Sequence, residues 1–213
     1  MRTEDLAASL AGNVRAVPRG AVPRRIAIGI AGGAILTMIL VVEWLGLRPD
    51  LSIAVTGFRF WMKWAYTIAI GAVAVAATIH LARPEAASPR RLWWLVVPAG
   101  LLVVLALGDV VRTPPADWAA LWQGGSWQVC TLNIAILSLP IFAGIMLAFR
   151  RFAPTRLRLT GAVAGLAAGA CGAVLYCLHC PEVSALFVLV WYSLGILAAV
   201  AIGALAGPKL LRW

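Results

Sequence analysis

Six long apolar runs, separated by short polar segments, dominate the pattern of the chain. They cover residues 26–45, 64–81, 92–108, 129–149, 159–178 and 183–205. An α-helix needs about 20 apolar residues to cross the hydrocarbon core of a bilayer, and each run is close to that length. A helix also satisfies its own backbone hydrogen bonds, which lipid cannot do. The pattern therefore predicts an all-α fold, a polytopic integral membrane protein with a six-transmembrane-helix bundle.

The composition agrees with a lipid bilayer as the main surroundings of the chain. Of its 213 residues, 62% are hydrophobic and 12% are charged. A soluble domain of this size would need more polar residues to cover its surface. The runs are also too long to be the strands of a membrane β-barrel.

The net charge of +10 is distributed as expected for a membrane protein. The cations cluster between the apolar runs and form no basic stripe, so we expect no nucleic acid as a partner. Fourteen of the 18 Lys and Arg residues fall in segments on the same side as the N-terminus, and four fall on the other side. Cytoplasmic segments are the ones enriched in Lys and Arg, so both termini are predicted to be cytoplasmic.

This pattern divides the chain into three parts. We expect a cytoplasmic segment and linker at 1–25, a transmembrane domain at 26–206 and a cytoplasmic tail at 207–213. Pro18 and Pro23 are predicted to break any helix in the linker.

The N-terminal segment has the features of a short docking helix. Glu4 and Asp5 would lie in its first turn, where negative charge is favourable. Leu6 and Leu10 are four residues apart and share one face. So short a helix is marginal alone and would gain order by docking on a partner. A disordered basic tail before the first membrane helix is the alternative.

Small and charged residues add two expectations about the bundle. Gly161, Gly165 and Gly169 recur at every fourth position, which favours close helix packing, with a homo-oligomer face as the alternative. Lys63 and Asp109 fall near the outer interface, where we expect their charges to stay hydrated. No acid or base falls at mid-membrane, which argues against a proton-coupled transporter, although a small transporter stays an alternative.

Two of the four cysteines are predicted to lie at the same depth. Cys130 begins the fourth run at its outer end, and Cys180 lies in the outer turn between the last two runs. Thiols facing an oxidising compartment are candidates for a disulfide or a soft-metal site. Cys171 lies in mid-helix and is interpreted as a small apolar residue.

The outer turn also contains a C-x-x-C pattern, formed by Cys177 and Cys180 with His179 between them. This spacing is typical of dithiol exchange, so a membrane thiol-disulfide oxidoreductase is the enzymatic alternative. Cys177 and His179 could instead be auxiliary ligands of a metal held with Cys130 and Cys180. The identity of such a metal is not indicated.

Several short segments together resemble the NrsF family over nearly the whole chain. They are TEDL at 3–6, GLRPDL at 46–51, SLP at 138–140, LHCPE at 178–182, SALF at 184–187, Trp191 and LLRW at 210–213. The family is known as negative regulators of an extracytoplasmic-function sigma factor, sigma-F, in proteobacteria.

The resemblance implies a six-helix protein of the bacterial inner membrane that is a regulator and not an enzyme, with no cofactor. Its cytoplasmic N-terminal segment would sequester the sigma factor, here through Glu4, Asp5, Leu6 and Leu10. The family's two characteristic cysteines are implicated in the response to heavy-metal or oxidative stress. By position these are Cys130 and Cys180, whereas Cys171 and Cys177 are not part of the family pattern.

Overall fold

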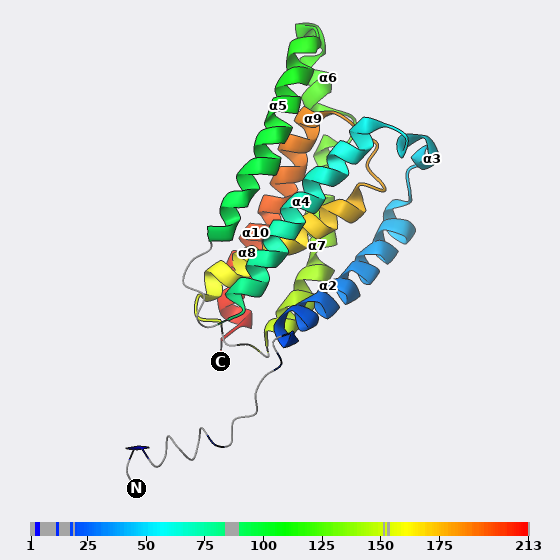
Figure 1. Ribbon diagram of the computed structural model, residues 1–213. Coiled ribbons are helices and arrows are strands. Elements are labelled where there is room, and N and C mark those ends of the chain that lie inside the picture. Colours follow the sequence, from blue (N-terminus) through cyan, green and yellow to red (C-terminus); the bar gives the residue numbers. More distant parts are fainter. Residues whose placement is uncertain are drawn as a thin grey trace.

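The computed structural model describes residues 3–4, 12, 18, 20–83, 90–150, 152 and 154–212. Every regular element in these residues is a helix (Figure 1). The elements are α2 (Ala21–Leu40), η1 (Val41–Leu45), α3 (Leu51–Ala54), α4 (Phe58–Leu81), η2 (Arg90–Leu95), α5 (Val96–Arg112), η3 (Pro115–Asp117), α6 (Trp118–Gln123), α7 (Trp127–Phe149), α8 (Leu157–Tyr176), α9 (Ala185–Phe187), η4 (Val188–Tyr192) and α10 (Ser193–Leu210).

Six helical stretches of the described residues are long and apolar enough to cross a membrane. They are Ala21–Leu45, Phe58–Leu81, Arg90–Arg112, Pro115–Phe149, Leu157–Tyr176 and Ala185–Leu210. Each corresponds to one of the six predicted apolar runs, so the all-helical prediction with six membrane-length helices is confirmed.

Two of the long α-helices, α2 and α4, begin five and six residues earlier than the apolar pattern predicts. α2 begins at Ala21 and includes Pro23, so the prediction that this proline breaks the helix is wrong. Pro is tolerated in the first turn because the backbone N–H groups there have no partner within the helix. α4 begins at Phe58, which places Arg59 and Lys63 within the helix rather than in the preceding loop.

The glycine stripe of α8 packs against α10, as the spacing predicts. A Cβ added at Gly161 would meet the carbonyl of Gly203, and one added at Gly165 would meet the carbonyl of Ala199. α2 approaches α7 in the same way, because a Cβ at Gly29 would meet the backbone of Gly144. Backbones this close exclude any side chain, so these glycines are used for packing within one chain.

The bundle has two distinct ends. Figure 1 shows the start of α2 and the C-terminal end of α10 at one end, and α3, α6 and α9 at the other. The turn at 177–184, which joins α8 to α9, belongs to the second end. The C-x-x-C pattern therefore lies at the end of the bundle opposite the start of α2.

Candidate functional site

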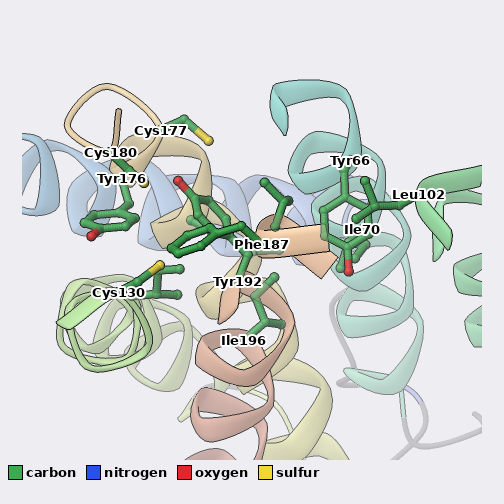
Figure 2. Close-up of a cluster of buried hydrophobic side chains, with 14 of the residues drawn as sticks. Tyr66, Ile70, Leu102, Cys130, Tyr176, Cys177, Cys180, Phe187, Tyr192 and Ile196 are labelled. Atoms are coloured by element: carbon green, nitrogen blue, oxygen red, sulfur yellow. The ribbon is translucent and has the colours of Figure 1, made fainter. Parts of the chain in front are cut away.

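Cys130 and Cys180 are brought together in one buried cluster, although 50 positions separate them in the sequence. This cluster, called here the cysteine cluster, consists of Cys130, Tyr176, Cys177, Cys180 and Tyr192, all of them fully buried. Figure 2 shows Cys130 on α7 facing Tyr176 and Cys180, which come from the end of α8 and the turn after it. All of these cysteines are free thiols.

The turn at 177–184 is built by local backbone chemistry. The last bonds of α8 reach into the turn, where the Cys180 N–H donates to the Tyr176 carbonyl at 3.0 Å. Pro181 has no N–H and so cannot continue the helix. Ser184 then caps α9, since its hydroxyl accepts a hydrogen bond from the Phe187 N–H at 3.3 Å. Cys180 is thus held immediately before the residue at which the helical hydrogen bonds must end.

Two cations converge on the main chain of this turn. The Lys63 ammonium donates to the carbonyl oxygens of Cys180, at 2.7 Å, and Glu182, at 3.0 Å. The Arg48 guanidinium donates to the same Cys180 carbonyl at 3.5 Å. Lys63 has no exposed surface and Arg48 is 7% exposed. The expectation that Lys63 stays hydrated is therefore wrong, because its helix begins six residues, or about 1.7 turns, earlier than predicted and includes Lys63 in the core.

The segments GLRPDL and LHCPE, which carried much of the family resemblance, contact each other. The Arg48 N–H donates to the Leu178 carbonyl at 3.1 Å. His179 Nδ1 lies 2.8 Å from the carbonyl oxygen of Gly46. Gly46 has a φ of 76°, a left-handed conformation that favours glycine. The segment that follows η1 is therefore tied directly to the turn that carries Cys180.

Arg48 is fixed by a two-pronged ion pair with Asp50, with both N···O distances at 2.7 Å. Hydrogen bonding to Arg48 is the main cause that lowers the pKa of the Asp50 carboxyl below its ordinary value. The same hydrogen bond raises the pKa of Arg48. The guanidinium is thereby oriented so that its remaining N–H groups point at the turn.

Two carboxylates join the cysteine turn to neighbouring elements. Glu182 accepts hydrogen bonds from the Gly125 N–H at 2.7 Å and from the Ser126 hydroxyl at 3.4 Å, just before α7. Asp109 on α5 accepts from the Arg59 guanidinium at 2.6 Å and from the Ala185 N–H at 3.0 Å. Asp109 is only 8% exposed, so the expectation that it stays hydrated is also wrong. Its partners explain why burial is tolerated.

The surroundings distinguish the two cysteines of the C-x-x-C pattern. Hydrogen bonding to the Cys130 thiol is the largest cause that lowers the pKa of Cys180, burial opposes the shift, and the Lys63 charge adds to it. Burial instead raises the pKa of Cys177 to about 12. Cys180 is therefore the more reactive thiol of the pair once a reagent reaches it.

Among the described residues, the buried hydroxyls of Tyr176 and Tyr192 have no hydrogen-bond partner. Two thiols held in one cluster can be oxidised to a disulfide or can share a soft cation. Within the described ranges, no three His, Cys, Asp or Glu side chains gather closely enough to hold a metal ion. His179, predicted as an auxiliary ligand, is engaged with Gly46 in this arrangement.

The predicted partner-binding residues are only partly described. Glu4 is helical and exposed. Asp5, Leu6 and Leu10 lie outside the described residues. The sequence did not indicate that Lys63, Arg48 or Tyr192 belongs to the site, and only the position of Arg48 within GLRPDL could have drawn attention to it.

Fold and site together define, over the described residues, an all-helical bundle with six helices of membrane-spanning length and a buried cysteine cluster at the end away from the start of α2 and the end of α10. The family model for NrsF, described as negative regulator of sigma F, matches residues 10–213. The chain belongs to the NrsF family, and it is a negative regulator of sigma F.

Two curated relatives match over their full lengths. The chain is 40% identical to the anti-sigma-F factor NrsF of Caulobacter vibrioides and 38% identical to the probable anti-sigma-F factor NrsF of Azospira oryzae. Both alignments cover 100% of each chain. The relatives are named as regulators, which agrees with a regulatory role. No solved structure matches the chain.

Proposed function

We propose that this protein is a membrane-bound anti-sigma factor of the bacterial inner membrane. It sequesters an extracytoplasmic-function sigma factor through its N-terminal segment, and it releases that factor when Cys130 and Cys180 respond to heavy-metal or oxidative stress. The observation that carries the proposal is that these two thiols lie in one buried cluster, at the end of the bundle opposite the start of α2. Membership of the NrsF family supports the sigma factor as the partner.

Outward-facing apolar side chains support insertion in a membrane. Ile28 and Ile35 on α2 are 61% and 65% exposed, and Leu101 and Val111 on α5 are 64% and 85% exposed. In water such faces would be a large apolar surface, whereas lipid tails cover them at no cost. The excess of cations near both termini favours an orientation with the N-terminal segment in the cytoplasm.

α2 is the element best suited to carry the signal across the bilayer. At one end it leads to Gly46 and Arg48, which contact the cysteine turn. Along its length it packs on α7, where the Thr37 hydroxyl donates to the Leu137 carbonyl at 2.9 Å. Its other end leads directly into the N-terminal segment. A displacement of the turn is therefore passed to the sigma-binding segment through one continuous helix.

The free energy needed to release the sigma factor favours a change at both thiols over a change at one. Moving the sigma factor from about 99% bound to about 1% bound requires a shift of about 5.5 kcal/mol. Oxidation to a disulfide removes two electrons and two protons from the pair, which an oxidant such as a peroxide accepts. Shared binding of a soft cation also uses both sulfurs. Either change alters the spacing between α7 and the turn.

Co-purification of the sigma factor from membranes tests the proposal. The full chain should retain the sigma factor, and deletion of residues 2–12 should abolish retention. Peroxide or a soft metal should release the factor from the full chain but not from Cys130→Ser or Cys180→Ser. Cys177→Ser is the matched control and should respond like the full chain.

Two results would count against the proposal. Unchanged retention after the deletion would show that the docking segment lies elsewhere. Equal loss of the response in Cys177→Ser and Cys180→Ser would favour the thiol-disulfide oxidoreductase instead.

A further inference from the structure

Lys63 is a buried cation that the proposed function does not use. It has no exposed surface. The described residues contain two ion pairs, Arg48–Asp50 and Arg59–Asp109, and Lys63 takes part in neither. Its ammonium instead binds the carbonyl oxygens of Cys180 and Glu182, and it lies 5.7 Å from the centre of the Tyr192 ring.

The buried ammonium of Lys63 makes it costly to move its hydrogen-bond acceptors away. Taking an ammonium out of water costs several kcal/mol, and this cost is offset only where hydrogen bonds replace the lost water. Bonds from a charged donor are about twice as strong as neutral ones. Both carbonyl acceptors of Lys63 belong to the turn at 177–184. The turn therefore cannot move away from α4 unless water enters to solvate the ammonium.

α4 is the fixed side of this contact. Two hydrogen bonds from the Thr67 hydroxyl reach the carbonyls of Lys63 and Trp64, both at 3.1 Å, within the same helix. Further along, Gly71 of α4 lies against Ala170 of α8. The turn has no such helix ladder between Cys180 and Ser184. It is the side of the contact that can move.

We propose that Lys63 is a positioning residue for the cysteine pair, a latch that holds the turn at 177–184 closed with Cys180 buried against Cys130. The latch sets how readily a reagent reaches Cys180, and hence the dose at which the sigma factor is released. The effect on sigma-factor release rests on the proposed function, whereas the latch itself does not.

Labelling of individual cysteines in the full chain, reconstituted in phospholipid nanodiscs, tests the latch. N-Ethylmaleimide adds to the thiol across its carbon–carbon double bond, and mass spectrometry of the peptides gives a rate for each cysteine. Cys171 on α8 lies away from the turn and is the internal reference. In Lys63→Met we expect Cys180 to react about tenfold faster relative to Cys171, because the turn loses its charged donor.

Three further variants separate the latch from a general loss of stability. Lys63→Arg keeps the cation and should restore slow labelling of Cys180. Thr78→Val removes another buried polar group of the same helix, whose bonds go to the carbonyls of Ala74 and Val163 and not to the turn, and should label like the unaltered chain. Lys63→Gln keeps an N–H donor without the charge, and replaces Lys63→Met if that variant does not fold.

The latch is overturned if Cys180 in Lys63→Met, or in Lys63→Gln as its replacement, reacts within twofold of the unaltered chain. It is also overturned if Lys63→Arg reacts as fast as Lys63→Met. The proposed function fails separately, if Cys180→Ser still releases the sigma factor on treatment. Fast labelling in Lys63→Met together with that result would retain the latch and reject the sensor.

Discussion

At the scale of single residues, Arg48 shows how a charge can organise the site without being part of the thiol chemistry. Its guanidinium is held by Asp50 and donates to the Cys180 carbonyl, while its backbone N–H binds the Leu178 carbonyl. Loss of Asp50 would leave a buried guanidinium without its counter-ion. Asp50 itself is half exposed, but its removal is destabilising because the Arg48 charge remains buried.

Asp50→Asn is therefore expected to lower the melting temperature of the purified protein at neutral pH. The pKa of the folded Asp50 carboxyl is depressed, so its stabilisation is fully present above about pH 4 and is lost as the pH falls through the depressed pKa. The difference in melting temperature between the two chains should shrink in acid. Asp117→Asn, at an exposed residue outside both ion pairs of the described residues, is the control. A difference that stays constant down to about pH 3 would contradict the assigned ion pair.

At the scale of elements, the closest backbone approaches between helices in this bundle are made by glycines. α8 and α10 approach through Gly161 and Gly203, each of which would place an added Cβ against the carbonyl of the other. Without a hydrophobic driving force between helices in lipid, such close backbone packing is the main source of helix association. The glycine of α5 at position 100 has no atom within 4 Å of an added Cβ.

This contrast predicts opposite results for the same substitution on two helices. Gly161→Ala should destabilise the protein by about 1–3 kcal/mol, because the backbones of α8 and α10 must separate. Gly100→Ala should be neutral or stabilising by up to about 1 kcal/mol, because alanine favours the helix. Denaturation of both variants in the same detergent measures the difference. Equal stability of the two variants would show that α8 and α10 are not packed through Gly161.

At the scale of the whole molecule, the even number of membrane-length helices places the start of the first helix and the end of the last at the same end of the bundle. The start of α2 and the end of α10 are at one end of the bundle, and the cysteine turn is at the other. A signal received at the cysteine cluster and an output at the N-terminal segment must therefore be separated by the length of the bundle. The sensing scheme requires these two ends to face different compartments.

Single introduced cysteines test this sidedness. Ser52, in α3 near the cysteine turn, and Lys209, near the end of α10, are both exposed, whereas the thiol of Cys180 is too deeply buried to report its compartment. A membrane-impermeant maleimide should label Ser52→Cys in intact spheroplasts and Lys209→Cys only after lysis. The reverse pattern would place the cysteine cluster in the cytosol and end the proposed sensing scheme.

The sequence alone was enough for the six helices, their even number, the shared depth of Cys130 and Cys180, and the family. These follow from local properties, since the length of an apolar run and the charge beside it do not depend on the rest of the chain. The sequence did not predict that α2 begins at Ala21 and α4 at Phe58, because in a packed helix charged residues can extend the helix beyond its apolar run. Only the tertiary structure decided that Lys63 is buried and that its ammonium meets a carbonyl 117 positions away. Such a contact depends on how α4 packs beside α8, and periodicity along one helix carries no information about the partner it meets.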